Sequence, residues 1–474
     1  MKKKIRIIYT VLFFVLCTIP IVFMPFVSAD ETAESRKLSE MPSFTTEDGR
    51  VNLEWPSQYE TYLSEHFAFR QDLVTLDSIT KSEIFAVSSN EKVIVGKNDW
   101  LYFYSTIDDY LARNTLTQRG VNNTAKTIGL MQEYVQNSGG EFLFMAAPNK
   151  NTVYPQFMPD RYVKSGNPTN LQMLNFALEE YSVNYLDLTE LFFSQDKVLY
   201  LQRDSHWTNE GALLVYNSLM DCLGIEHDDF SNVNHHTEKC WSGDLDSMIF
   251  PTLNNLSDQE IYDMDYSFNY ISNFKTEDDM IIKTVNENNT ASILMYRDSF
   301  GRSLYPFIAE GSYKAEFSRE TPYRLSLMHD INAQYVVFEI VERNIPNITE
   351  KAPVMSAPTR ELDTSASIIR SEDNKCETAE KSGMLKIYGV LDEAYFEDNS
   401  DIYITLEGDS VFCYEAFPIF ESELFETEAR SDYGFSLFID TKAVADGTYN
   451  VNAYIKSGES FICTDTLCTV EIIN

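Results

Sequence analysis

Residues 291–301 read ASILMYRDSFG, a short apolar run followed by a polar turn and a serine. The apolar run predicts a buried strand that ends near Met295, and the chain then turns at Arg297 and Asp298 before a helix. Ser299 is therefore expected at the carboxyl end of a strand, the edge where open α/β sheets bind ligands. Serines at strand ends more often cap helices, so Ser299 alone is weak evidence for a reactive hydroxyl.

The same alternation of apolar strand and helix continues on both sides of this stretch. Strands are expected at residues 141–147, 183–186, 291–295 and 334–341, and helices at 123–138, 170–181 and after 208. Short apolar strands separated by helices are typical of a mostly parallel sheet that is covered on both faces. We therefore expect one α/β domain over residues 91–350.

The composition changes after this domain. Residues 351–383 contain few aromatic side chains and several Ser, Pro and Ala residues, which predicts a linker. From residue 384 to 474, short strands alternate with Asp, Asn, Gly and Ser turns, which predicts a β-sandwich. Tyr414, Phe417 and Phe420 could hold a glycan there by stacking, and a spacer or docking role is the alternative.

The first 29 residues set the compartment. Four basic residues among the first six precede an uncharged stretch from Ile7 to Ala29, which is long enough to cross a bilayer. Its last residues, Val27 to Ala29, also resemble a cleavage site, so a membrane anchor and a removable signal peptide remain alternatives. Either one predicts that the remainder is exported. Residues 30–90 are expected to form an extended segment followed by a helix.

Charge argues against one class of partner. The chain has 73 Asp and Glu residues against 37 Lys and Arg, a formal net charge of −36. Such a chain repels phosphate backbones, so we expect no nucleic-acid binding.

Cysteine usage argues against a metal cluster. No Cys-x-x-Cys motif and no His pair at zinc spacing occurs, so we expect neither a metal site nor a cofactor. The six cysteines outside the N-terminal stretch allow fifteen disulfide pairings. Proximity in sequence suggests Cys222 with Cys240, and Cys413 with Cys463 or Cys468, and free buried thiols are the alternative.

Asp204-Ser205-His206-Trp207 is the second feature with chemical potential. A serine nucleophile needs a base, and the base needs a group that fixes its tautomer and stabilises the imidazolium. An Asp and a His two residues apart can face each other across one turn, which leaves Nε2 of His206 for a hydroxyl. The alternative is a surface histidine beside a helix-capping aspartate.

Together these stretches resemble a known family. Asp-x-His-Trp-Thr-x-x-Gly at 204–211, followed by Asp-Ser-Phe at 298–300, is similar to the alginate O-acetyltransferase group, also called DHHW proteins, of the SGNH hydrolase-like superfamily. Further similar pieces occur in the same order between residues 30 and 350: Glu34-Ser35-Arg36 with Pro42, FAFRQDL at 67–73, VGKNDWLYF at 95–103, Pro148-x-Lys150, and VVFEIVERN at 336–344.

The resemblance implies a catalytic triad of Ser299, His206 and Asp204 on a circularly permuted SGNH-like fold. The sequence departs from the family pattern at Ser205, where the family has His, and at Arg297, where it has Gly. Tyr305 and Arg319 occupy positions where the family tends to contact substrate or oxyanion. Asn149 follows a predicted strand end and is a further candidate for the same edge.

The resemblance also implies a function. It predicts an extracytoplasmic O-acetyltransferase that modifies a cell-surface or exported polysaccharide through an acetyl-serine, with a multi-pass membrane acyltransferase as acetyl donor. A secreted serine acetylesterase would use the same triad, and acetate release with and without a glycan acceptor separates the two. A non-catalytic polysaccharide-binding or assembly protein is the third alternative, against which labelling of Ser299 by a serine-reactive probe would argue.

Overall fold

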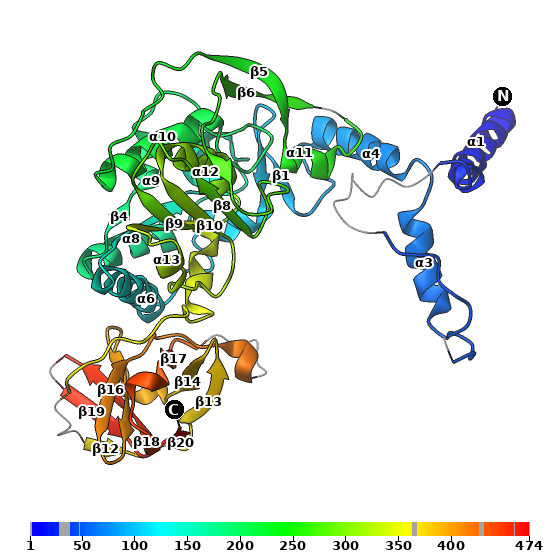
Figure 1. Ribbon diagram of the computed structural model, residues 1–474. Helices are drawn as coiled ribbons and strands as arrows, with labels where there is room; N and C mark the ends of the chain where they lie inside the picture. Colours follow the sequence, from blue (N-terminus) through cyan, green and yellow to red (C-terminus); the bar gives the residue numbers. More distant parts are fainter. Residues whose placement is uncertain are drawn as a thin grey trace.

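The computed structural model describes residues 2–27, 38–46, 48–253, 255–362, 367–425, 431–458 and 460–473. Two sequence features, the end of the expected cleavage site at residues 28–29 and the Glu34-Ser35-Arg36 motif, lie outside these residues. The described chain forms an N-terminal arm, an α/β unit and a C-terminal β unit (Figure 1).

A seven-stranded sheet forms the centre of the α/β unit, in the order β4-β3-β11-β9-β10-β8-β7. Five of its strands run parallel: β4 (Tyr185–Leu186), β3 (Glu141–Ala147), β11 (Tyr335–Val341), β9 (Ser292–Tyr296) and β10 (Lys314–Ser318). β8 (Ile281–Val285) and β7 (Asn269–Tyr270) add an antiparallel edge. The mixed α/β architecture agrees with the alternation in the sequence. The antiparallel edge was not predicted, because its strands are short and only partly apolar.

Helices cover both faces of this sheet (Figure 1). Along β3, Phe142 and Phe144 join the apolar cluster that includes α6 (Gln118–Asn137) and α8 (Asn170–Glu180). Leu143 and Met145 join the opposite cluster, which includes α10 (Asn209–Cys222) and α12 (Gly301–Gly311). Successive strand residues point to opposite faces, so an unbroken apolar run is what a doubly covered strand requires.

Threonine side chains fix where the covering helices begin. Thr208 accepts a hydrogen bond from the backbone N–H of Gly211, which places the start of α10 where the sequence predicts it. Thr117 accepts from the N–H of Gly120, so α6 begins earlier than the predicted residue 123. These caps satisfy backbone donors that have no partner within the helix.

Further short elements complete the α/β unit. They are β1 (Val93–Val95), which pairs with β2 (Leu101–Phe103), α5 (Ile107–Tyr110), α7 (Lys150–Val153), α9 (Leu188–Phe193), α11 (Asp244–Ile249), α13 (Leu327–Asp330), and the antiparallel pair of β5 (His235–Ser242) and β6 (Leu256–Tyr262).

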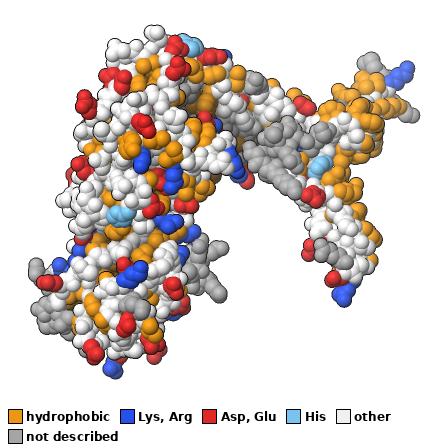
Figure 2. Space-filling view, viewed as in Figure 1, with side chains coloured by type: hydrophobic (Ala, Val, Ile, Leu, Met, Phe, Trp, Pro, Cys, Tyr) orange, Lys and Arg blue, Asp and Glu red, His pale blue; other side chains and the backbone are white. Residues whose placement is uncertain are grey.

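The arm consists of α1 (Lys2–Phe23), α3 (Trp55–Glu65) and α4 (Arg70–Phe85), which project from the α/β unit (Figure 1). α1 is long and apolar enough to cross a membrane, a property that it shares with signal sequences. The helix expected after residue 53 is divided in two, because Phe69 adopts a left-handed conformation with φ 60°. Apolar side chains cover much of the visible arm (Figure 2). On α4, Ile84 and Phe85 are exposed.

The C-terminal unit contains two sheets. The larger one has the order β12-β19-β18-β15-β16, with β20 also paired to β18, and the smaller one has the order β13-β14-β17. Its strands are β12 (Ser367–Ile369), β13 (Lys375–Lys381), β14 (Met384–Val390), β15 (Asp401–Glu407), β16 (Val411–Glu415), β17 (Gly434–Ile439), β18 (Gly447–Ser457), β19 (Ser460–Thr464) and β20 (Cys468–Ile472). Both sheets contribute to one apolar cluster, for example through Leu437 and Val451.

Two expectations about this region need correction. Residues 351–383 do not form a plain linker: Val354 and Met355 are buried, and β12 and β13 lie in the same segment. Tyr414 and Phe417 are buried rather than open to a glycan, and Phe417 is only 1% exposed. Phe417 instead packs into the apolar cluster beneath α6, because the β unit lies directly against that helix.

Polar contacts also join the α/β unit to the β unit. Arg119 on α6 donates hydrogen bonds to the backbone carbonyls of Glu397 and Asp432, both at 2.9 Å. Lys126 forms an ion pair with Asp401 at 3.1 Å and another with Glu415. The α/β unit and the β unit therefore meet through apolar packing and paired charges.

Candidate active site

Ser299 lies in the turn between β9 and α12, at the carboxyl edge of the sheet. The side chain of Asp298 fixes this turn: Oδ1 accepts from the N–H of Phe300 at 2.8 Å, and Oδ2 accepts from the N–H of Val341 at 2.7 Å. The N–H of Asp298 donates to Oε2 of Glu339 at 2.9 Å. The serine is thus held against the end of β11, the neighbouring strand.

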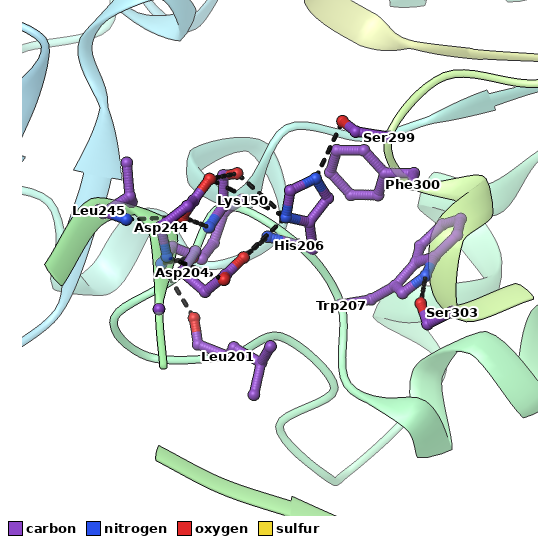
Figure 3. A network of polar contacts seen from close by, with 12 residues as sticks. Lys150, Leu201, Asp204, His206, Trp207, Asp244, Leu245, Ser299, Phe300 and Ser303 are labelled. Atoms are coloured by element: carbon purple, nitrogen blue, oxygen red, sulfur yellow. Dashed lines mark hydrogen bonds and ion pairs between the residues drawn. The ribbon is translucent and has the colours of Figure 1, made fainter. Parts of the chain in front are cut away.

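Ser299, His206 and Asp204 form one chain of hydrogen bonds (Figure 3). Nε2 of His206 lies 2.9 Å from Oγ of Ser299, and Nδ1 lies 2.7 Å from Oδ1 of Asp204. This is the order of contacts in which a histidine can take a proton from a serine while a carboxylate orients the ring. The structure therefore brings together the three residues that the resemblance selected.

The carboxylate of Asp204 is buried and fully engaged. Besides the ring of His206, Oδ1 accepts from the backbone N–H of His206 at 2.9 Å. Oδ2 accepts from the indole N–H of Trp241 at 2.8 Å and from the N–H of Asp244 at 3.0 Å. Burial alone would raise the pKa of Asp204, but hydrogen bonds from His206 and Trp241 and the charge of the imidazolium hold it below its ordinary value.

The pKa of His206 is shifted in the opposite direction. Burial acts to lower the pKa of its imidazole, but the hydrogen bond to Asp204 and the charges of Asp204 and Asp244 raise it above the ordinary value. The site therefore stabilises the imidazolium that forms when a proton leaves Ser299. The raised pKa makes the imidazole a stronger proton acceptor, which suits general base catalysis.

Lys150 supports the loop that carries Asp204. Its side chain is only 4% exposed, and Nζ donates to the backbone carbonyls of Leu201 at 3.0 Å, Gln202 at 3.0 Å and Asp204 at 2.5 Å. Three carbonyl oxygens match the three N–H donors of an ammonium group. Burial lowers the pKa of Lys150 to about 7, while the charge of Asp204 acts in the opposite direction.

Asp244, at the start of α11, is a second carboxylate beside the histidine. Its Oδ2 accepts from the hydroxyl of Ser205 at 2.6 Å and lies 4.0 Å from Nδ1 of His206. Gly243 allows this approach, because a Cβ at that position would lie 2.2 Å from the carbonyl oxygen of Arg203. Burial and the charge of Asp204 raise the pKa of Asp244 above its ordinary value.

The donor atoms of Asp204, His206 and Asp244 lie within 4.8 Å of one another, a spacing that a metal ion would accept. Hydrogen bonds within the protein already engage the side-chain atoms of these three residues. Nδ1 of His206 bonds to Asp204, the other oxygen of Asp204 has two N–H donors, and Asp244 accepts from Ser205. These contacts orient the imidazole ring of His206.

A cavity of about 390 Å³ opens beside Ser299 and His206. Aromatic side chains dominate its lining, with a smaller number of polar groups: Trp207, Trp241, Tyr262, Tyr266, Phe268, Tyr270, Tyr305, Phe307, Asn209, Gln259, Glu277, Arg302 and Ser303 all contribute. Such a mixture of apolar surface and a few polar groups is typical of ligand sites.

The three further candidates lie in different surroundings. Tyr305 lines the cavity, and its hydroxyl is 3.0 Å from that of Tyr270. Arg319 forms an ion pair with Asp278 at 3.1 Å and is absent from the described cavity lining. Asn149 is buried away from that lining, with its backbone N–H on Glu342 at 2.8 Å.

The sequence interpretation missed Trp241 and Asp244 and gave Lys150 no specific role. Trp241 and Asp244 lie about 40 residues beyond Asp204 in an acidic, polar stretch that resembles solvated surface. A tryptophan inside such a stretch was the available signal. Their contact with Asp204 depends on how the β5–β6 pair folds back over the sheet edge, which local spacing does not encode.

Part of the sequence is similar to a known protein family. Residues 93–252 match the family described as SGNH hydrolase-like domain, acetyltransferase AlgX, which confirms the resemblance drawn from the motifs. This match includes Asp204 and His206 and ends before Ser299. No curated protein matches the sequence.

Three solved structures show weak overall similarity. A DHHW family protein from Eubacterium siraeum is 15% identical, with 49% of this chain and 88% of that chain covered and a TM-score of 0.39. Bacillus cereus PatB1 is 14% identical, with 53% and 96% covered and a TM-score of 0.42. Pseudomonas aeruginosa AlgX is 12% identical, with 81% and 94% covered and a TM-score of 0.35.

Proposed function

We propose that the protein is an O-acetyltransferase that modifies hydroxyl groups of a cell-surface or exported polysaccharide through an acetyl-Ser299 intermediate. The observation that carries this proposal is the hydrogen-bond chain from Asp204 through His206 to Ser299 at the mouth of an aromatic cavity. The match of residues 93–252 to an acetyltransferase family supports the choice of acetyl transfer.

In the first half-reaction, Oγ of Ser299 attacks the carbonyl carbon of an acetyl donor while Nε2 of His206 takes the hydroxyl proton. Asp204 stabilises the resulting imidazolium through Nδ1. We propose that backbone N–H groups at the start of α12 bind the oxyanion, since helix N-termini favour negative charge. The leaving group then takes the proton from His206, and the acetyl group remains on Ser299.

In the second half-reaction, a sugar hydroxyl in the cavity attacks the acetyl-serine. His206 removes the hydroxyl proton and returns a proton to Oγ of Ser299, which restores the free enzyme. Water can take the place of the sugar, and the product is then acetate. Transfer therefore requires that the cavity hold a sugar more effectively than water near the serine.

We place this chemistry outside the cytoplasm, with α1 as membrane anchor or signal segment. Acetyl-CoA is not available there, so the acetyl group must cross the membrane first. A multi-pass membrane acyltransferase is the proposed donor. α4 lies on the same arm as α1 (Figure 1) and has exposed apolar side chains, including Leu76 and Ile84.

We also propose a domain division that follows these roles. Residues 91–350 form the catalytic domain, on a circularly permuted SGNH-like fold in which the Asp–His pair precedes the serine. The two sheets built from β12 to β20 form a β-sandwich that includes residues 384–474 and the two strands before them. Phe417 packs beneath α6 of the α/β unit. We therefore propose that the sandwich docks onto that unit and does not bind a glycan through its own aromatic residues.

Intact-mass spectrometry tests the proposal directly. After incubation with an activated acetyl ester, the protein should gain one acetyl group, and peptide mapping should place it on Ser299. Ser299→Ala should abolish the adduct, whereas the matched control Ser194→Ala, at the end of α9, should retain it. An adduct that persists in Ser299→Ala would show that the serine assignment is wrong.

A further inference from the structure

The cavity beside Ser299 has an aromatic wall that comes from one stretch of chain. Trp241, Tyr262, Tyr266, Phe268 and Tyr270 all line it, and Tyr266 keeps 44% of its surface exposed. Partly exposed aromatic faces offer apolar area to a flat ligand at low entropic cost. The C–H faces of sugar rings are such surfaces. Four of these five residues lie beyond the part of the chain that matches the acetyltransferase family.

The cavity contains charge, but that charge is balanced. Among the described lining residues, Arg302 is the one Lys or Arg side chain and Glu277 is the one Asp or Glu side chain. They pair with each other, with Nε of Arg302 at 2.9 Å from Oε2 of Glu277. The guanidinium also lies over the ring of Trp241, 5.3 Å from its centroid.

Glu277 is held in place from behind. Nη2 of Arg297 donates to the backbone carbonyl of Glu277 at 2.6 Å, and Arg297 is the residue with which β9 leads into the Ser299 turn. The backbone at Glu277 is thus fixed relative to the nucleophile. A ligand carboxylate that approached Arg302 would have to displace the carboxylate of Glu277 from the ion pair.

Three further charges near the serine are negative, whereas Arg297 and Lys150 are buried cations already bonded to backbone carbonyls. Asp204 and Asp244 lie behind His206, and Asp298 adjoins Ser299 in the chain. The whole chain has a formal net charge of −36, which repels polyanions over long range. An anionic polymer would therefore meet repulsion at a distance and no unpaired cation of the described lining at the site.

We infer that the cavity beside Ser299 binds an uncharged glycan as acetyl acceptor, and that it discriminates against uronic-acid polymers. This inference rests on the proposed acetyl transfer. Its sugar ring stacks on the aromatic wall, and the hydroxyl and amide groups of Asn209, Gln259 and Ser303 lie within the same lining to bond its hydroxyls. The Glu277–Arg302 pair is the specificity element.

A competition among matched acceptors tests this inference. The full chain is given an activated acetyl ester with equal concentrations of a neutral oligosaccharide, a uronate oligosaccharide or a glucosamine oligosaccharide of the same length. The neutral glycan should receive the largest share of acetyl groups, and acetate release should fall as transfer rises. Equal or better transfer to the uronate or to the cationic glucosamine oligomer would overturn the inference.

Two variants connect the result to the residues. Glu277→Gln frees Arg302, so the ratio of uronate to neutral transfer should rise severalfold, and an unchanged ratio would contradict the role of the ion pair. Tyr266→Ala should lower transfer to the neutral glycan while the hydrolysis of a small acetyl ester continues. Tyr104→Ala is the matched control, because Tyr104 is similarly exposed at 47% and lies outside the cavity lining.

The readouts separate this inference from the proposed function. Absence of the acetyl-Ser299 adduct would reject acetyl transfer itself. A normal adduct together with a preference for a charged acceptor would reject only the neutral-glycan inference.

A different observation carries a second inference. Cys376 on β13 and Cys468 on β20 face each other across the two sheets of the β unit, and their sulfur atoms lie 3.2 Å apart. Proximity in sequence suggested Cys413 with either Cys463 or Cys468, whereas the structure places Cys376 beside Cys468, 92 residues away. Both thiols are partly buried.

We propose that Cys376 and Cys468 form a disulfide that joins the two sheets once the chain is exported. A disulfide oxidant, by thiol–disulfide exchange, accepts the two electrons and two protons of the thiols and leaves as two thiols, and one S–S bond forms. Export makes such oxidants available. The bond would close a long loop and restrict the unfolded chain.

Alkylation and intact-mass measurement test the bond. The reduced full chain is incubated with oxidised glutathione, then denatured and alkylated. It should carry two fewer alkyl groups than the reduced chain, and its melting temperature should rise. Cys376→Ser should abolish both changes, whereas Cys222→Ser should leave them intact. Alkylation of both residues after oxidation, or a stable glutathione adduct on either one, would reject the disulfide.

Discussion

Lys150 and Lys126 show two ways in which this fold accommodates a lysine away from solvent. Lys150, beside the triad, has three backbone carbonyls as partners, and burial lowers its pKa to about 7. Lys126, at the boundary between the two units, is held by the carboxylates of Glu415 and Asp401. Burial opposes its charge, but those carboxylates raise its pKa above the ordinary value.

The difference between the two lysines indicates different roles for the triad edge and for the boundary between the units. Paired charges neutralise each other, and the Lys126 network joins the two units through close ion pairs that offset the cost of burial. The Lys150 ammonium instead holds three backbone carbonyls of the loop that presents Asp204 and His206. We therefore expect changes at the triad edge to affect turnover and changes at the boundary to affect stability.

The largest expected effect is on turnover. Ser299→Ala should lower the rate of acetyl ester cleavage about 10⁴-fold or more, and adding His206→Ala should lower it little further, because nucleophile and base act as a unit. The melting temperature should stay within a few degrees of the parent value. A rate close to that of the parent protein would contradict the site, and a large thermal shift would contradict the separation of the two regions.

The next effect is on stability. Phe417→Ala should lower the free energy of unfolding by about 4 kcal/mol, because it leaves a cavity where the β unit packs beneath α6. Denaturant titration measures this loss. At a temperature where the variant is folded, cleavage of a small ester should match the parent rate, and a parallel loss of rate would show that the two regions are one functional unit.

Lys150→Met tests the positioning role at the triad edge. Without the ammonium, the 201–204 loop loses three hydrogen bonds, and the ester cleavage rate should fall about 100-fold, a barrier increase of about 2.7 kcal/mol. Circular dichroism and the melting temperature show whether the variant is folded at the assay temperature. A folded variant with the parent rate would remove Lys150 from the site.

Lys126→Met is the matched change at the boundary. It leaves the buried carboxylate of Glu415 with one cationic partner fewer, so the free energy of unfolding should fall by about 2 kcal/mol. Small-ester cleavage should not change. If Lys126→Met reduced turnover as much as Lys150→Met does, the contrast between the two lysines would be lost.

The smallest effect concerns pH. A neutral His206 is needed as base, and its pKa is raised, so kcat/KM should fall on the acid side with an apparent pKa above about 6.5. The charge of Asp244 contributes to that rise, so Asp244→Asn should move the acid limb to lower pH. A shift to higher pH would contradict this electrostatic role, as would an unchanged profile.

Several elements of the fold could be predicted from the sequence, because their signals lie within a few neighbouring residues. The apolar runs at 141–147 and 335–341 predicted strands buried on both faces, and Thr208 predicted the start of α10. Asp204, His206 and Ser299 were selected by a motif together with their place at strand and helix ends. The structure brings these three side chains into one hydrogen-bond chain.

Other features could not be predicted from the sequence, because they depend on contacts between segments that lie far apart in the chain. Phe417 belongs to an aromatic-rich β segment that suggested an open glycan surface, yet it is buried against the α/β unit. Trp241 and Asp244 reach Asp204 only because Gly243 lets α11 pack against the loop at residue 203. Neither arrangement has a local periodicity that would reveal it.

By itself, the sequence determined the alternation of strands and helices, the N-terminal apolar helix and the identity of the triad candidates. These properties follow from hydrophobic periodicity, capping chemistry and the spacing of a few reactive side chains, all of which act over a few residues. The tertiary structure decided the hydrogen-bond partners of Asp204, the burial of Lys150, the aromatic cavity with its Arg302–Glu277 pair, and the approach of Cys376 to Cys468. Burial, pKa and pairing depend on the distances between segments far apart in the chain, and only folding fixes those distances.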